Sequence, residues 1–427
     1  MHDIFILNRN KISNLTFALI FIMPFFRYYD IPVIEVSVET LLLAIITILC
    51  FMLLKVSHVE NEKTLMSKSR NSFLCFFIWL YFITWIYEIG TVFNSYNSAS
   101  SYSLMTYIMI VPAAYIIYSL FDHRWNVNNV FTIYSKLVRF VIYIYAIQWG
   151  LKILGITISF KMPFFPYNDS WEYLNRIVFG MNLRPTSIFS EPAHLAEYLL
   201  PYLAICLFDN REYKNLKKAT IITIIVISTA SGNGIVGAFI LWGTYLMIFA
   251  KINLVYRIVI VLFAAVVCFF TYQFLLTIPT YSHIFGELFV NTTGKYSGTK
   301  ADYRVYRGFD YYFQLPTFQK LTGIGYQHMH AFANEYNIAS KFDSLNDAFE
   351  YFSTITQVLI YSGVIGMSFF VNHLYCLWKY RDLLVKGLLI LSVALWFSSQ
   401  MLFANSHIMY MALIATSIMY EPETKES

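Results

Sequence analysis

The sequence predicts an all-α, polytopic membrane protein, and two observations lead to this prediction. Only 13% of the 427 residues are charged whereas 58% are hydrophobic, and the mean hydropathy is +0.56. Soluble globular proteins carry about a quarter of charged residues. Apolar runs also recur along the whole chain with short polar gaps, which predicts a single integral membrane domain over residues 1–427 rather than several soluble domains.

Apolar runs long enough to cross about 30 Å of hydrocarbon predict about twelve transmembrane helices. The predicted spans are 12–31, 36–55, 72–92, 102–121, 134–157, 192–208, 219–231, 234–250, 257–278, 352–375, 384–403 and 406–420. No small-residue cleavage site follows the first span, so it is expected to stay in the chain. The seventh span is short and meets the eighth at Ser231–Gly234, either as a tight hairpin or as a broken helix inside the protein.

The distribution of lysine and arginine predicts the orientation. The short loops near 93–101 and 404–406 contain neither residue, whereas most basic residues fall in the short loops on the opposite side. Since basic residues are enriched in short cytoplasmic loops, both termini are expected in the cytoplasm.

Two long loops, about 158–191 and 279–351, are then expected to face outward. They are longer than simple connections between helices need to be, which predicts that they have a function. Both contain arginines and many aromatic residues, and the second also contains three histidines. The aromatic side chains suit stacking on sugars, and they equally suit the headgroup region of a membrane.

The segment from Arg184 to Tyr198 concentrates polar chemistry at the mouth of the sixth span. A helix is expected to begin at Pro192, with Ser190 or Glu191 as its cap.

Helical spacing then places Glu191, His194 and Tyr198 on one face, while Glu197 lies about two turns inside the apolar region. Two interpretations stay open for these residues. The carboxylates either cap and hydrogen-bond the helix, or they lie, with Arg184, beside a polar substrate.

The second loop contains a predicted helix, KADYRVYRGFDYYFQLPTF, in which Arg304, Arg307 and Tyr311 share one face. Two neighbouring guanidinium groups favour an anion, and their planar forks suit phosphate oxygens. The aspartates of the same helix could instead neutralise the arginines.

This helix is expected to stop before a tight turn at Gly323 and Gly325, where backbone can approach a ligand closely. His328 and His330 follow at once and are candidate site residues.

Other function classes lack support in the sequence. There is no nucleotide-binding, zinc-protease or nucleophile-elbow motif. The basic residues are scattered, so no nucleic-acid partner is expected. The five cysteines lie in apolar runs without metal-like spacing, so neither a disulfide framework nor a zinc site is predicted.

Taken in order, four pieces resemble the O-antigen polymerase and O-antigen ligase superfamily of bacterial cell envelopes. These are RPTSIFSEPAHLAEYL, the turn STASGNG, the fifteen-residue separation of Arg307 and Gly323, and YFSTITQVLIYSGVIG. They cover residues 184–366, and the first 180 residues match in hydropathy alone. The resemblance implies a GT-C-like membrane fold.

One departure distinguishes the two branches of this superfamily. The ligases carry a histidine eleven residues before the first glycine of a GxxG pattern, and that position here holds Phe352, followed by Ser353. The comparison favours a polymerase, although His328 or His330 could replace the ligase histidine in space.

A polymerase joins oligosaccharide repeat units carried on undecaprenyl pyrophosphate, with one lipid-linked chain as donor and another lipid-linked unit as acceptor. By this resemblance Arg184, Arg304 and Arg307 would bind the pyrophosphate. The sequence shows no DxD-like pair for a divalent ion, so neither a metal nor a cofactor is expected. The expected base is Glu191, ahead of His328, His330 and Asp302. His194, Tyr198, Tyr311, Gly323, Gly325 and His328 are the expected substrate-binding residues.

The expected location is the bacterial inner membrane, and the expected partners are the two lipid-linked substrates, membrane lipids and a chain-length regulator protein. The nearest alternative is an O-antigen ligase that transfers polymer to lipid A core. A different class is a flippase for the same lipid-linked units, but few charges lie within the predicted spans. A membrane scaffold without activity is the remaining alternative.

Overall fold

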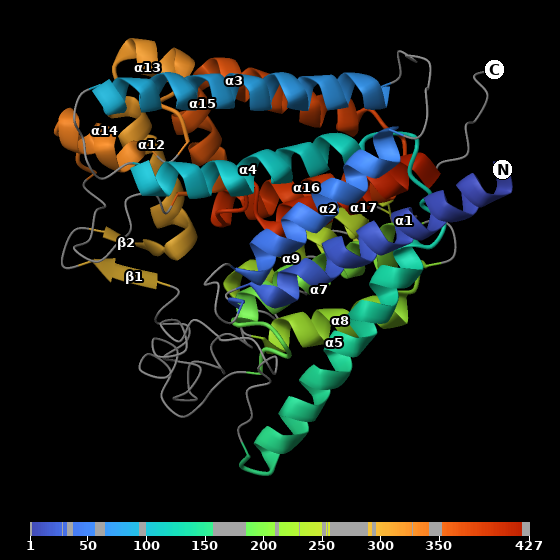
Figure 1. Ribbon diagram of the computed structural model, residues 1–427. Coiled ribbons are helices and arrows are strands. Elements are labelled where there is room, and N and C mark those ends of the chain that lie inside the picture. The colour runs from blue at the N-terminus through green and yellow to red at the C-terminus, as the bar shows by residue number, and fades with distance from the viewer. Residues whose placement is uncertain are drawn as a thin grey trace. The chain divides into compact units, whose positions relative to one another are not determined.

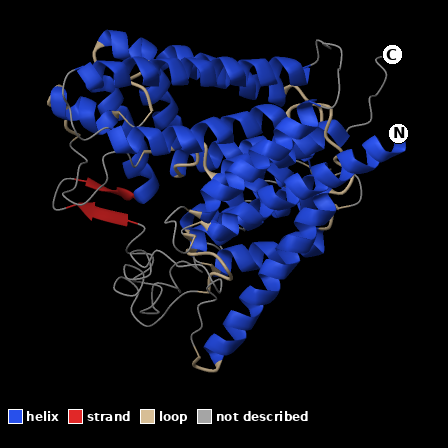
Figure 2. Cartoon of the chain, in the orientation of Figure 1, coloured by secondary structure: helices blue, strands red, loops and turns tan. Residues whose placement is uncertain are grey.

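In the computed structural model, the described part of the protein is almost entirely helical (Figure 2). The structure describes residues 2–27, 29–31, 37–55, 65–93, 100–156, 185–209, 213–229, 231–249, 253, 255–256, 289–292, 296–326, 328–340 and 352–420. One antiparallel hairpin joins β1 (Phe289–Thr292) to β2 (Tyr296–Thr299), with Phe289 opposite Thr299. The predominance of helices agrees with the predicted all-α membrane class.

The chain divides into two compact units, which are described separately. Unit 1 comprises Met1–Pro24, Val36–Tyr134 and Ala301–Ser427, and unit 2 comprises Phe25–Glu35 and Ser135–Lys300. Each unit therefore combines segments that are distant in the sequence.

Unit 1 is a bundle of apolar helices in which α3 lies along α15 (Figure 1). The helix α2 contacts α1 and α4, and α17 contacts α1, α4 and α16. Its helices are α1 (His2–Ile22), α2 (Val38–Lys55), α3 (Leu65–Phe93), α4 (Ser100–Leu120), α12 (Lys300–Gln314), α13 (Thr317–Thr322), α14 (Met329–Glu335), α15 (Thr354–Trp378), α16 (Leu383–Ser398) and α17 (Asn405–Tyr420).

Unit 2 is built around α7, which packs against both α8 and α9. Its helices are α5 (Val130–Ile153, from Ser135 onward), α7 (Pro192–Phe208), α8 (Leu216–Ser228) and α9 (Gly232–Thr244), and α9 continues into a π-helical turn at Tyr245–Phe249. Gly234 lets α9 approach α7, because a Cβ there would lie 2.6 Å from the Cβ of Ala196.

Three helices in the described part are long and apolar enough to cross a membrane, namely Leu65–Ile89, Val130–Ile153 and Thr354–Trp378. A helix overlaps each predicted span except 257–278, which lies outside the described residues, as does most of the loop 158–191. The apolar helices agree with a membrane protein, and the count of twelve crossings stays a prediction.

The seventh and eighth predicted spans form two separate helices that pack on each other as a tight hairpin. Ser231 caps α9 by accepting a bond from the Gly234 N–H, and Trp242 Nε1 donates to Thr223 Oγ1 between the two helices. The prediction of one continuous helix through LPTF in the second loop is wrong. The helix ends at Gln314 and restarts as α13 after Pro316, because proline lacks the N–H that a continuous helix needs.

Candidate functional site

In unit 2, the turn before α7 is clamped to α5 by one buried glutamine. Gln148 Oε1 accepts bonds from the N–H groups of Thr186 (3.1 Å) and Ser187 (2.6 Å), and its Nε2 donates to the Ser187 carbonyl (2.9 Å). Ser187 is buried at a φ of 57°, a strained conformation that persists only where its surroundings hold it. The clamp fixes the direction in which the chain enters α7.

The helix α7 begins at Pro192, as predicted, and Glu191 occupies the capping position. Of the two predicted caps, Ser190 and Glu191, the structure has Glu191 at this position, but its side chain makes no capping bond. Its backbone is extended, as is usual for a capping residue, and its carboxylate is half-buried. The carboxylate is thus not used by the helix.

A polar network connects the start of α7 with Arg27, which follows the 3-10 turn Met23–Phe26. Arg27 Nη1 lies 3.3 Å from His194 Nδ1, which in turn lies 3.9 Å from Glu197 Oε2. The side chains of His194 and Glu197 are 14% and 8% exposed. The sequence analysis missed Arg27, because 167 residues separate it from His194.

Tyr198 is fully buried between the rings of Phe25 and Phe189, each 5.2 Å away. It is a core side chain of unit 2. Its part in substrate binding stays a prediction.

In unit 1, α12 carries an arginine that is only 1% exposed. The guanidinium of Arg307 lies over the rings of Tyr311 (5.8 Å) and Phe352 (5.7 Å), and these two rings meet edge to face. Gly308 permits this approach, because a Cβ at that position would collide with Thr356 in the first turn of α15. The predicted pair of Arg307 and Tyr311 is therefore brought together against α15.

The predicted glycine turn is present and docks onto a kink in α15. Gly323 and Gly325 adopt φ values of 86° and 80°, and Gly363 in α15 adopts 63°. The N–H groups of Ile324 and Gly325 donate to the carbonyls of Ile360 (3.1 Å) and Tyr361 (3.0 Å). Glycine is required at Gly323 and Gly363, because a Cβ at either would collide with the backbone of the other segment.

His328 is buried at the start of α14, where its Nδ1 lies 2.8 Å from the carbonyl of Tyr326. Burial lowers the pKa of His328 below its usual value, although the bond to Tyr326 opposes this shift. The imidazole is therefore neutral at pH 7. Asp310, one of the aspartates expected to neutralise the arginines, accepts a bond from Ser340 Oγ (2.7 Å).

Buried amide groups near the start of α15 were missed by the sequence analysis. Gln357 is 1% exposed and Asn405, at the start of α17, is 4% exposed. Within the described part of the chain, neither amide has a hydrogen-bond partner for its side-chain oxygen or nitrogen. Thr354 joins the two regions, since its N–H and Oγ1 donate to the Ser399 carbonyl and its Oγ1 accepts from the Met401 N–H.

A signal for these amides was present in the sequence, because polar residues inside apolar runs are costly and mark functional positions. Gln148 and Gln357 both interrupt predicted spans. Buried polar atoms without partners are rare, so Gln357 and Asn405 call for a ligand or water.

The predicted site residues fall into two groups. Arg307, Tyr311, Gly323, Gly325 and His328 belong to unit 1, and Glu191, His194 and Tyr198 belong to unit 2. Arg184 and the side chains of Arg304 and His330 lie outside the described residues. The convergence of Arg184, Arg304 and Arg307 on Glu191 therefore stays a prediction.

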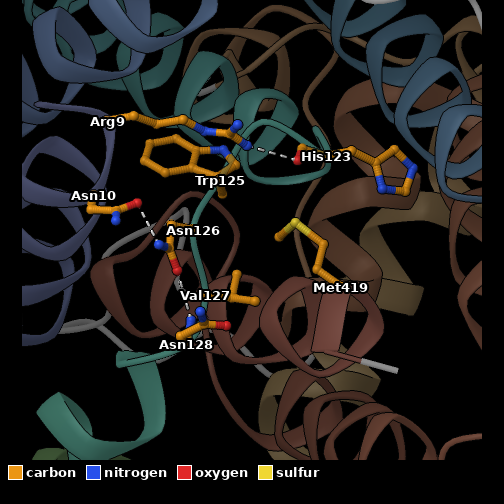
Figure 3. Close-up of a pocket in the computed structure, with 8 residues that line it drawn as sticks. All are labelled: Arg9, Asn10, His123, Trp125, Asn126, Val127, Asn128 and Met419. Atoms are coloured by element: carbon orange, nitrogen blue, oxygen red, sulfur yellow. Dashed lines mark hydrogen bonds between the residues drawn. The ribbon is translucent and has the colours of Figure 1, made fainter. Parts of the chain in front are cut away.

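A separate polar pocket of about 310 Å³ lies in unit 1 (Figure 3). Arg9 donates to the His123 carbonyl at 3.2 Å, and Asn126 bridges to Asn10 across the pocket. Met419 also lines it, so the first and last helices of the chain meet at one end of unit 1. None of the predicted site residues lies there.

Among the described residues, no group of three or more His, Cys, Asp or Glu side chains could hold a metal ion. No family model, no curated protein and no solved structure matches the chain.

Proposed function

We propose that the chain is a membrane glycosyltransferase that polymerises oligosaccharide repeat units carried on undecaprenyl pyrophosphate. In this proposal it has about twelve spans, with both termini in the cytoplasm of a bacterial cell and the reaction at the outer face of the inner membrane. The proposal rests on the resemblance to O-antigen polymerases and on one observation, the buried guanidinium of Arg307.

Arginine is rarely buried as fully as Arg307, because a buried cation loses its hydration. The aromatic rings of Tyr311 and Phe352 support Arg307 on their faces and hold the planar fork in one orientation. Such a fork matches phosphate oxygens two at a time. This supports a role in binding the pyrophosphate of the donor.

In the proposed reaction, a hydroxyl oxygen of the acceptor sugar attacks the anomeric carbon of the donor. The bond from that carbon to the pyrophosphate oxygen breaks, and the pyrophosphate leaves with the electron pair and its lipid. The hydroxyl proton passes to the Glu191 carboxylate, which α7 leaves unused. Arginine side chains stabilise the charge that develops on the leaving group.

The unpartnered amides support a polar, uncharged ligand close to the start of α15. Gln357 and Asn405 each offer a donor and an acceptor, the combination that sugar hydroxyl and acetamido groups require. Replacement of Gln357 by leucine removes both polar atoms and keeps similar bulk. We expect Gln357→Leu to fold at least as well as the native chain and to shorten the polymer it makes.

The test is complementation of a polymerase-null host, read as the ladder of long chains on gels at matched protein levels. Arg184→Ala, Arg304→Ala and Arg307→Lys are expected to lose the ladder, with activity at Arg307→Lys falling by about 100-fold. Lys379→Met is the matched control, because Lys379 also lies over an aromatic ring, Tyr375 at 4.4 Å, at the opposite end of α15. It should keep the full ladder.

Full ladders from the three arginine variants would overturn the assignment of these residues. A host that accumulates lipid-linked polymer and bare core when the native gene is lost would indicate a ligase instead. Single repeats on the core, with no longer chains, are the outcome that supports a polymerase.

A further inference from the structure

The Gly323–Gly325 turn lies well inside the bundle, although the sequence places it in an outward loop. It bonds to the carbonyls of Ile360 and Tyr361, which follow the Ser353 cap of α15 by seven and eight residues. At 1.5 Å of rise per residue, the turn lies about 11 Å along α15 from the Ser353 cap.

The helix α3 gives an independent measure of the same depth. Trp79 Nε1 donates to the carbonyls of Thr322 (3.2 Å) and Ser362 (2.9 Å), and Thr84 Oγ1 accepts from the Tyr326 N–H (2.9 Å). Trp79 and Thr84 precede the end of α3 at Phe93 by about 21 Å and 14 Å of helix.

The helices α3 and α15 are antiparallel, since Ser69 and His373 bond near their other ends. Figure 1 shows α13 beside both helices. The hydrocarbon core of a membrane is about 30 Å thick, so the two depths place the turn inside it if α3 and α15 span the membrane.

Irregular backbone is tolerated at membrane depth only where its polar groups are satisfied within the protein. This condition holds here. The Gly323 N–H donates to Gln319 (2.8 Å), the Ile324 and Gly325 N–H groups donate to α15, and the Tyr326 N–H donates to α3. The Thr322 carbonyl accepts from Trp79.

The outer face of this segment is apolar and exposed. Phe313, Phe318 and Leu321 are 66%, 68% and 48% exposed, and Ile78 on the neighbouring helix α3 is 56% exposed. Contact of such apolar side chains with water is unfavourable, whereas contact with the acyl chains of lipids is favourable. Lys320 has a stem long enough for its ammonium group to reach the headgroups.

We infer that α13 and the Gly323–Gly325 turn form a re-entrant membrane segment whose Phe318 and Leu321, together with Phe313 at the end of α12, contact the hydrocarbon chains of outer-leaflet lipids. The segment enters beside α15, turns at the glycines and leaves beside α3, where His328 and Phe332 of the next helix stack near Tyr87. The inference holds whichever reaction the protein catalyses.

The test is a depth measurement on the full chain in proteoliposomes of phosphatidylcholine and phosphatidylglycerol. Single cysteines replace Phe313, Phe318 or Leu321 in a background without the five native cysteines, and each carries a nitroxide label. Oxygen and a water-soluble nickel chelate then report on lipid and water. Ile78→Cys is the lipid-facing control and Asn334→Cys, exposed on α14, is the aqueous control.

We expect the labels at 318 and 321 to match the Ile78 control, with relaxation by oxygen exceeding relaxation by nickel several-fold and with 321 deeper than 318. Labels at both positions that match the Asn334 control would overturn the inference.

Native protein provides a second measurement that needs no substitution. A lipid with a diazirine near the end of its acyl chain should cross-link to the peptide that contains residues 313–321. Cross-links to that peptide from a headgroup diazirine alone would also overturn the inference.

Discussion

Arg27 and Arg307 are both drawn into helical packing, but the two units hold them in different ways. Arg307 rests on the faces of Tyr311 and Phe352, whereas Arg27 meets His194 with Glu197 beside it. Aromatic faces keep their packing when the cation is replaced by an apolar chain of similar length. A polar network loses a partner and leaves buried polar groups behind. The comparison therefore contrasts a cation held over aromatic rings with one held beside polar side chains.

The largest expected effect comes from breaking the turn that anchors α13 to α15. Gly363→Ala places a Cβ against the Leu321 carbonyl at a φ of 63°, so the free energy of unfolding should fall by at least about 3 kcal/mol. Thermal unfolding in detergent, followed by intrinsic fluorescence, measures the loss.

Gly150→Ala is the matched control for that variant, because nothing lies within 4 Å of the new Cβ. It should be neutral or stabilise α5 by about 0.5–1 kcal/mol. Equal melting temperatures for the two variants would show that the docked turn does not stabilise unit 1.

The next effect tests the polar side of the comparison. Arg27→Met leaves His194 and Glu197 without their cationic neighbour, and the free energy of unfolding should fall by about 1–3 kcal/mol. A double-mutant cycle with His194→Phe should give a coupling energy of at least about 0.5 kcal/mol. Simple additivity of the two changes would remove Arg27 from the network.

The aromatic side predicts a smaller effect on stability and a larger one on activity. Arg307→Lys keeps a cation over the rings of Tyr311 and Phe352, so it should change the free energy of unfolding by less than about 1 kcal/mol, although lysine lacks the planar fork. The ladder of long chains should nevertheless disappear. A variant that unfolds, or one that keeps the ladder, contradicts the interpretation of Arg307 as a ligand-binding cation.

The smallest expected effect is a pH dependence from His328, whose pKa in the folded state is lowered by burial. The unfolded chain then binds a proton more readily, so stability is full above the ordinary pKa of about 6.5 and falls as the pH drops below it. The slope cannot exceed about 1.4 kcal/mol per pH unit for one proton. His328→Gln should flatten the difference in melting temperature between pH 7.5 and pH 5.5, and an unchanged difference would exclude His328 as its source.

Local features of this fold were predictable from the sequence. Apolar runs predicted helices whose ends agree closely with the structure, such as α7 from Pro192 to Phe208, because a membrane requires long apolar stretches. The Gly323–Gly325 turn was also predicted, since glycine tolerates positive φ.

Long-range partners were not predictable in the same way. The break at Pro316 went unpredicted because strong helical periodicity continued on both sides of it. The pairing of Arg27 with His194, the clamp of Gln148 on Ser187 and the unpartnered amide of Gln357 depend on which helices become neighbours. The sequence likewise gave no indication that part of the predicted outward loop 279–351 packs against both α3 and α15.

The discontinuous make-up of unit 1 has a consequence for its biogenesis. Its first 24 residues and its helices α2 to α4 emerge from the ribosome long before α15 to α17, while residues 135–300 of unit 2 are completed in between. The helix α17 packs against α1 and α4. These two early helices therefore lack one of their packing partners until α17 has been synthesised. We expect ribosome-bound chains that end at residue 300 to resist proteolysis in unit 2 and to be cleaved readily in α2 to α4. Equal resistance of both regions would show that the early helices find temporary partners, such as an insertase, during synthesis.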